Sequence, residues 1–326
     1  MDYTITQESF ASLASYRADS GHNLRWHSIF ILPAWLQVWW QSFGSGAELY
    51  LRAVRQREKI VGIAPLQIMD KTASIIGSAD VCDYLDFVVA PGRERDFFTV
   101  LLDDLRQKGI NRLDLRHVRP DSTVLTALVA IAREREYDVL SNLEEVSLEL
   151  DLPSTWEEYL ATLIGKQRHE VRRKLRRLQK VGNIDYHFVE DSAAVLAVMG
   201  TFLKLFSKSR KEKAKFMTAR MESFFRSLAE AMAEIGLLRF GILEIDTLPV
   251  AMDMCFDYND SVYLYNSGYD PNYNSLSVGL LSKALLIKDS IHRGRKRFDF
   301  LKGGETYKYH LGGREVPLYS CQIIIK

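Results

Sequence analysis

The sequence has few cysteines and no long apolar run. Its three cysteines, Cys82, Cys255 and Cys321, are widely separated and odd in number, so they predict neither a disulfide framework nor a zinc site. No apolar stretch approaches the roughly 18 residues that a membrane-spanning helix needs. The first residues are acidic and no apolar segment follows them, unlike a signal peptide. We therefore expect a cytoplasmic protein without a transmembrane segment or a metal site.

The chain also lacks a large net charge of either sign. Its 43 basic and 42 acidic residues leave a formal net charge of +1, so the protein as a whole is not an electrostatic binder of nucleic acid. Its 326 residues, with 47% hydrophobic and 26% charged side chains, are ordinary for a globular protein and long enough for two domains. Any anion-binding surface must therefore come from a local cluster of basic residues.

Hydrophobic periodicity divides the chain into two similar halves, each with a helix, a strand hairpin, a strand, a helix and a final strand. In the first half, Pro33 suits the first position of a helix, and residues 49–54 and 60–69 suit a hairpin. In the second half we expect helices at residues 155–181, 193–208 and 218–235, and strands at residues 237–245, 250–258 and 262–269. The repeated order indicates a tandem mixed α/β duplication, with domains at residues 1–150 and 151–326. Each domain would have a mixed, mostly antiparallel sheet flanked by helices.

The last quarter of the chain carries the most informative pattern. The strand at residues 262–269 runs into a polar turn with Asn274, Ser275 and Ser277, and an apolar helix follows Gly279. The free N–H groups and the positive dipole end of such a helix point at one spot, where a pyrophosphate would fit. An ordinary strand–helix crossover has the same pattern, so both interpretations stay open.

The order of motifs in this quarter resembles a known family. The matching segments are Gly268-Tyr269-Asp270-Pro271, Ser277-Val278-Gly279, residues 299–305 and Tyr307-Lys308. They are similar to the C-terminal half of the CelD-type (cellulose-biosynthesis-associated) GNAT acyltransferases, which are relatives of the FemAB peptidoglycan-bridge aminoacyltransferases. Family members often carry proline at the position of Val278. Residues 33–44 and 60–66 resemble the first domain of the same family. The resemblance implies tandem GNAT-like (acyl-CoA N-acyltransferase) domains, with the donor-binding site in the second.

The resemblance also implies where the reaction takes place. In GNAT-type folds a central strand offers a backbone N–H to the thioester oxygen, and here that point would lie near Tyr265 and Asn266. The lysine of the Tyr-Lys motif is functional in Fem-type enzymes, which implies a role for Lys308. Asp253 and Asp299 each lie on a strand between apolar residues that face the other way, so each carboxylate either faces the cleft or belongs to a salt bridge.

The candidate site residues fall into three groups. The catalytic candidates are Lys308, Asp253, Asp299 and Tyr265. The cofactor-binding candidates are Asn266, Ser275, Ser277, Val278 and Gly279. The substrate-binding candidates are Tyr269, Arg168, Arg172, Glu305 and Tyr307.

A helix predicted between Lys166 and Lys180 carries a dense positive charge. An apolar stripe recurs at helical spacing, while eight basic residues and one acid, Glu170, cover the remaining surface. One interpretation is a solvated surface helix. The other is a platform for the phosphates of coenzyme A, an acidic lipid surface, tRNA or a nucleotide-linked substrate. A second basic run between Lys204 and Lys215 suggests one positive face or cleft.

We therefore expect an N-acyltransferase that moves an acyl group from acyl-CoA to an amine small molecule or envelope precursor, in cell-envelope or exopolysaccharide metabolism. Such a site must hold both reactants, polarise the carbonyl and accept a proton, and no permanently bound cofactor is expected. One alternative is a Fem-like aminoacyltransferase that uses aminoacyl-tRNA. The other is a non-catalytic binding or scaffold protein that keeps the fold.

Overall fold

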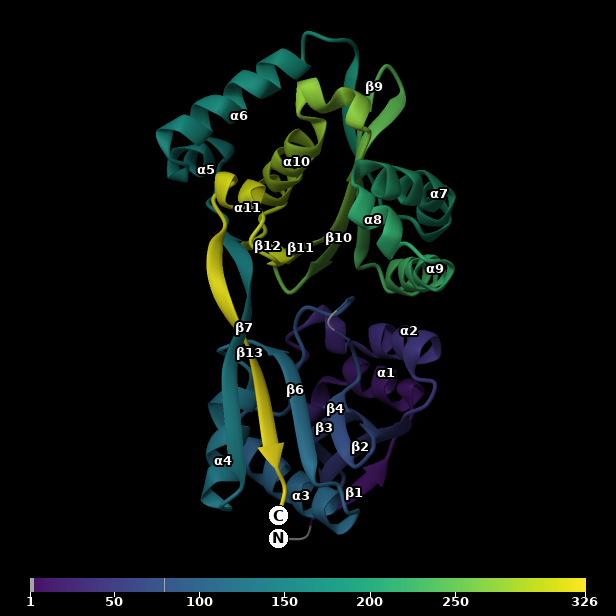
Figure 1. The fold of residues 1–326 in the computed structure, drawn as a ribbon, viewed down its shortest axis with the longest axis vertical. Helices are drawn as coiled ribbons and strands as arrows, with labels where there is room; N and C mark the ends of the chain where they lie inside the picture. Colours follow the sequence, from purple (N-terminus) through teal and green to yellow (C-terminus); the bar gives the residue numbers. More distant parts are fainter. Residues whose placement is uncertain (1–2, 79) are drawn as a thin grey trace. The chain divides into compact units, whose positions relative to one another are not determined.

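The computed structural model describes residues 3–78 and 80–326 (Figure 1). Its contacts divide the chain into two compact units. The first contains Met1–Val146 and Val316–Lys326, and the second contains Ser147–Glu315. The chain passes between the units along two strands, β7 (Asp138–Asp151) and β13 (Arg314–Ile324). Residues 316–326 therefore pack with the first unit, whereas the sequence pattern placed all of residues 151–326 together.

The first unit is a mixed sheet with helices. Its strands are β1 (Tyr3–Gln7), β2 (Glu48–Gln56), β3 (Lys59–Met69), β4 (Thr72–Ile75), β5 (Val88–Val89), β6 (Arg112–Val118) and parts of β7 and β13. Its helices are α1 (Phe10–Ala18), α2 (Pro33–Phe43), α3 (Glu94–Gln107) and α4 (Val129–Glu134), with short helical turns at Ser20–His22, Ile29–Ile31 and Val124–Leu128.

The local sequence signals of the first unit are confirmed. Pro33 occupies the first turn of α2, where its missing N–H has no intrahelical partner to lose. The predicted hairpin forms as β2 paired antiparallel with β3. The apolar positions Phe97, Leu101 and Leu105 of α3 are fully buried, because a helical period places them on one face.

The second unit contains a six-stranded arrangement in the order β7-β12-β11-β10-β9-β8. The strands are β8 (Ile184–Val189), β9 (Leu238–Ile245), β10 (Leu248–Tyr258), β11 (Ser261–Tyr269) and β12 (Arg297–Lys302), with the end of β7. The helices are α5 (Trp156–Thr162), α6 (Gly165–Leu178), α7 (Ser192–Ser209), α8 (Lys211–Phe216), α9 (Ala219–Glu234), α10 (Val278–His292) and α11 (Thr306–His310), with the 3₁₀ segment η4 (Pro271–Leu276).

Helices cover both faces of this sheet. Helix α10 packs on β9, β10 and β11 and is itself contacted by α5 and α6, while α7 packs on β10 and β11 and α9 packs on β9 (Figure 1). The apolar core on the α10 side joins Leu178 of α6 to Leu243, Val278 and Leu281. All neighbouring pairs are antiparallel except β11 with β12, which is parallel.

One predicted helix is wrong in its extent. Residues 155–181 form two helices, because Leu163 and Ile164 have extended backbone angles. Thr155 and Glu158 form a capping box that starts α5, and the break lets α5 and α6 each contact α10. The short helices α8 and α11 are additional to the predicted elements. Among the helices of the described residues, none is both long and apolar enough to cross a membrane.

Candidate functional site

Strands β11 and β12 of the second unit form a fork. Their parallel pairing joins Ser261–Tyr263 to Arg297–Asp299, and within the described residues the pairing ends there although β11 continues to Tyr269 and β12 to Lys302. On its other side, β11 shifts register against β10 at Tyr265, because Leu264 pairs with Cys255 and Asn266 pairs with Met254. A bulge of this kind redirects the backbone, so the main chain of β11 leaves the regular sheet pattern at Tyr265.

The Tyr265 ring packs among other aromatic side chains. It stacks on Phe225 of α9, with centroids 5.7 Å apart and an interplanar angle of 26°, and lies 5.5 Å from the ring of Phe256. These contacts account for the aromatic residue at the bulge through packing. A catalytic role of Tyr265 stays a prediction.

Asp299 and Lys308 hold the β12 arm of the fork. The Asp299 carboxylate accepts a hydrogen bond of 2.7 Å from the backbone N–H of Leu301. The Lys308 ammonium donates to the carbonyl oxygens of Leu301, Lys302 and Gly303 at 3.0, 2.6 and 3.0 Å. It also lies 2.9 Å from a carboxylate oxygen of Glu305.

Both side chains are buried, each 2% exposed. Leu301 has a left-handed backbone (φ +61°), and β12 shifts its register against β7 between Asp299 and Lys302. The two polar side chains therefore stabilise an irregular backbone, since the three N–H donors of the ammonium reach three successive carbonyl oxygens. Their predicted catalytic roles remain predictions.

Asp253 belongs to a buried ion pair, which is one of the two interpretations that the sequence left open, although the sequence did not indicate the partner. Its carboxylate is 0% exposed and lies 3.4 Å from the Lys283 ammonium of α10. Lys283 also donates to the carbonyl oxygen of Gly279 at 2.8 Å and lies 5.3 Å from the centre of the Tyr307 ring. Burial raises the pKa of Asp253, and Lys283 opposes this without cancelling it. The second carboxylate oxygen has no hydrogen-bond partner among the described residues.

Lys213 is a partly buried cation beside the fork. Its ammonium donates to the carbonyl oxygen of Ser267 on β11 and lies 4.6 Å from the centre of the Phe206 ring. Burial lowers the pKa of Lys213 to about 7, with contributions from the positive charges of Lys283 and Arg210. The sequence pattern grouped Lys213 with a surface basic run. The sequence signal for Lys283 is a lysine within an apolar helical stretch.

The junction of β11 and α10 collects most of the predicted cofactor-binding residues. Ser277 is the N-cap of α10, with a left-handed backbone (φ +59°) and no side-chain capping hydrogen bond. The side chain of Val278 is fully buried. A Cβ added to Gly279 would lie 2.8 Å from the Tyr269 ring, so close packing requires glycine at this position. Ser275 lies in η4 and Asn266 lies on β11.

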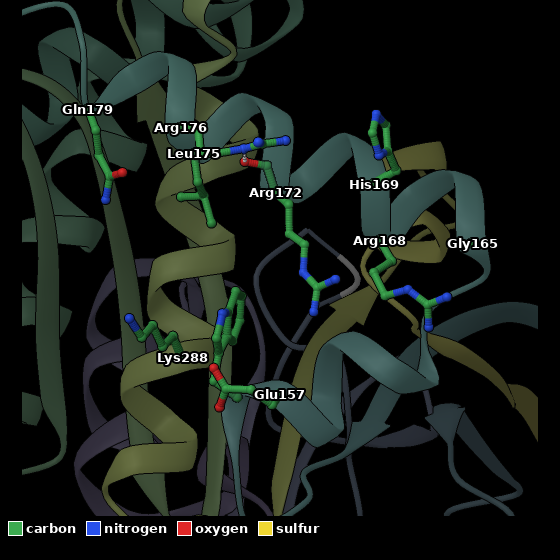
Figure 2. Close-up of a pocket in the computed structure, with 10 residues that line it drawn as sticks. Glu157, Gly165, Arg168, His169, Arg172, Leu175, Arg176, Gln179 and Lys288 are labelled. Atoms are coloured by element: carbon green, nitrogen blue, oxygen red, sulfur yellow. Dashed lines mark hydrogen bonds between the residues drawn. The ribbon is translucent and has the colours of Figure 1, made fainter.

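A cationic groove of about 800 Å³ lies between α5, α6 and α10. Its basic lining residues are Arg168, His169, Arg172, Arg176 and Lys288, and its one acidic lining residue is Glu157. Figure 2 shows the side chains of Arg168 and Arg172 extending from α6 into this space, with Glu157 and Lys288 beyond them. We call this space the α6 groove.

The predicted substrate-binding residues divide between separate places. Arg168 and Arg172 line the α6 groove. Tyr269 packs on Gly279 at the β11–α10 junction, and Glu305 and Tyr307 neighbour Lys308 and Lys283. Burial raises the pKa of Glu305, but the nearby Lys308 outweighs this and holds the pKa below its ordinary value. The structure therefore brings together the fork, the ion pair and α11, and places the two arginines in the α6 groove.

Comparisons with known proteins give one family match and several similar folds. Residues 165–309 match the family model of the acetyltransferase (GNAT) domain. No curated protein matches the chain in sequence. Many solved structures resemble its fold, including the following three. FemX has a TM-score of 0.68 at 12% identity and covers 98% of this chain and 96% of its own. A conserved protein of Bacteroides thetaiotaomicron VPI-5482 scores 0.60 at 13% identity, covering 98% and 99%. L-PGS from Bacillus licheniformis scores 0.55 at 11% identity, covering 89% and 90%.

At such low identity the solved structures show the fold alone. They agree with the fold class expected from the sequence, a mixed α/β protein of the GNAT kind, which is confirmed. The matched residues 165–309 lie entirely within the second unit and contain the fork, Asp253, α10 and the three lysines Lys213, Lys283 and Lys308. Residues 165–309 of the second unit therefore match the GNAT acetyltransferase family model and have the fold that the resemblance implied.

Proposed function

We propose that this protein is an N-acyltransferase that moves an acyl group from acyl-CoA to an amine by direct transfer. The observation that carries the proposal is the fork of β11 and β12, which lies inside the part of the chain that matches the GNAT domain. A fork leaves main-chain groups of two strands without sheet partners. A thioester would lie between its arms, with its carbonyl oxygen held by a backbone N–H of β11 near Tyr265 and Asn266.

The residues around the fork divide the remaining tasks. The start of α10, from Ser277 to Gly279, would hold the phosphates of the donor through backbone N–H groups and the helix dipole. Lys308 and Asp299 would keep the β12 arm in place, and Lys308 would also stabilise developing negative charge. In the transfer, the amine nitrogen bonds to the carbonyl carbon, the carbon–sulfur bond breaks and the coenzyme thiolate leaves. Lys213, with its lowered pKa, is a candidate acceptor for the amine proton.

A Fem-like reaction is the second candidate function. In that case the acyl group would come from aminoacyl-tRNA. Two observations favour it: the fold similarity to FemX over 98% of this chain and the cationic α6 groove.

A non-catalytic binding or scaffold protein is the third candidate function. The intact Gly279 and Lys308 favour an active protein. The proposal also includes a location in the cytoplasm and a role in envelope metabolism. It further includes the absence of a permanent cofactor and contact with a polyanion or membrane surface.

Two measurements test the proposed function. Mass spectrometry of ligands that co-purify with the protein should detect coenzyme A or an acyl-CoA, and calorimetry should show saturable binding of acetyl-CoA. Release of free thiol in the presence of an amine panel would demonstrate transfer. Co-purified tRNA together with transfer from aminoacyl-tRNA but not from acyl-CoA would instead establish the Fem-like reaction. Donor binding without transfer to any acceptor would favour the scaffold.

A further inference from the structure

The α6 groove carries positive charge that the protein does not neutralise. Arg168, Arg172, Arg176 and Lys288 all line it. Among the described residues, no carboxylate lies within ion-pair distance of any of these four cations. Two of them make only long contacts to backbone carbonyl oxygens, Arg168 to Ala161 at 3.5 Å and Arg176 to Arg172 at 3.4 Å. The other side of α6 differs, because Glu170 pairs with Arg173 and Lys174.

The arginines form a straight row along the helix. Arg168, Arg172 and Arg176 are four residues apart, so they lie on one side of α6 and span about 12 Å at a rise of about 1.5 Å per residue. Such a row matches a ligand whose anionic groups repeat along a line, and it is longer than one diphosphate needs. Guanidinium groups also bind phosphate oxygens in pairs.

The groove also contains a partly exposed aromatic ring. Trp156 of α5 lines it and lies against Tyr159, with ring centres 5.0 Å apart. Tyr159 is fully buried and donates a hydrogen bond of 3.0 Å to the carbonyl oxygen of Leu311. The indole therefore has a fixed support. A positively charged groove with an aromatic ring is the common arrangement of proteins that bind single-stranded nucleic acid.

We propose that the α6 groove binds a single strand of nucleic acid, with Arg168, Arg172 and Arg176 on successive phosphates and Trp156 against a base. A membrane surface fits less well, because the apolar residues Val171 and Leu178 of α6 are buried in the protein and the cations line a hollow rather than a flat face. The proposal rests on the second candidate function, in which aminoacyl-tRNA is the acyl donor. Binding is measured without acyl transfer, so the two proposals can fail separately.

The experiment measures fluorescence anisotropy of a labelled 12-nucleotide single-stranded RNA with the full chain, between 50 and 200 mM salt. The paired variant Arg172→Gln with Arg176→Gln should weaken binding at least tenfold. A plot of the logarithm of the binding constant against the logarithm of the salt concentration should also become less steep. Its slope should change by about 1.4, since each phosphate contact on a single strand contributes about 0.7. Trp156→Leu should weaken binding about tenfold without changing the slope, because it removes stacking and no charge.

The matched control is Arg177→Gln with Lys180→Gln, which removes the same charge from the last turn of α6 and the turn that follows it, outside the groove. It should leave the affinity within threefold of the wild type. Equal weakening by both paired variants would overturn the proposal in favour of a diffuse charge effect. It would also be overturned if the RNA failed to bind at 50 mM salt while vesicles with anionic headgroups, or ADP alone, bound with an affinity that depends on Arg172. Circular dichroism melting of each variant confirms that these exposed substitutions leave the fold intact.

Discussion

The Lys308 ammonium lies 3.0 Å from the carbonyl oxygen of Leu301, a residue whose backbone has the left-handed angle φ +61°. A branched side chain rarely adopts this conformation, which costs about 1–2 kcal/mol. The ammonium also contacts the next two carbonyl oxygens, and Asp299 binds the N–H of Leu301. The strained end of β12 is thus held by a buried cation and a buried anion.

Lys308→Met should lower both stability and activity. The change removes the donor from three carbonyl oxygens in a buried place, and each unsatisfied buried polar group costs about 1–3 kcal/mol. We expect a loss of at least about 2 kcal/mol in urea unfolding, and a fall in kcat of about tenfold to a thousandfold if the ammonium also stabilises charge in the transition state. The rate is measured well below the melting temperature of the variant.

A control separates the two roles of Lys308. Asp299→Asn weakens the same backbone support without removing the cation. If Asp299→Asn and Lys308→Met lose equal activity for equal loss of stability, Lys308 acts through structure. An unchanged kcat in folded Lys308→Met would remove the catalytic assignment.

Asp253→Asn should destabilise the second unit strongly. The substitution leaves the Lys283 ammonium buried without its counter-charge, and breaking a buried ion pair typically costs about 3–5 kcal/mol. Lys283→Met should cost a similar amount. The double variant should recover much of the loss, because no buried charge is left. Urea unfolding of the four proteins gives the coupling energy, and strictly additive losses would show that the pair does not interact.

The Gly279 position tests the donor site. Gly279→Ala and Gly279→Asp both place a Cβ about 2.8 Å from the Tyr269 ring, so both should destabilise the protein by about 1–3 kcal/mol through overpacking. Only aspartate adds a negative charge at the start of α10. If donor phosphates bind there, calorimetry should show coenzyme A binding at least tenfold weaker in Gly279→Asp than in Gly279→Ala. Equal affinities of the two variants for coenzyme A would show that the donor phosphates do not bind at the start of α10.

Lys213→Met should stabilise the protein in a pH-dependent way. Burial lowers the pKa of Lys213 to about 7 in the folded state, against an ordinary value of 10.5. Below pH 7 both states bind the proton, so the folded state carries the full cost of the buried charge. Between pH 7 and about 10.5 the unfolded state binds more protons, so the stability that wild-type protein derives from this group rises with pH.

The melting temperature of Lys213→Met should therefore exceed that of the wild type most at pH 6, and the difference should shrink by pH 9. Lys215→Met, which removes an exposed neighbouring lysine, is the control and should show little difference at either pH. A difference for Lys213→Met that stays constant from pH 6 to pH 9 would contradict an ammonium with a lowered pKa.

Local sequence signals determined the elements of this protein and much of their order. The strand, polar turn and helix at residues 262–292 form as β11, η4 and α10, because turn formers and helical periodicity act over a few residues. The basic surface of α6 follows from the same periodicity, since Val171 and Leu178 turn inward and the charged residues must turn outward. The resemblance of this region to the GNAT family agrees with the matched family model.

Only the tertiary structure decided which charges are buried and which residues meet. Lys213, Lys283 and Lys308 are ordinary lysines in the sequence. In the fold, the carbonyl oxygen of Ser267 on β11 binds Lys213 and Asp253 of β10 binds Lys283, while Lys308 turns back onto the carbonyl oxygens at the end of β12. Tertiary packing also decided the helix break at Leu163 and Ile164 and the place of residues 316–326 in the first unit. Burial and ion pairing depend on packing between distant segments, and periodicity within one segment carries no information about them.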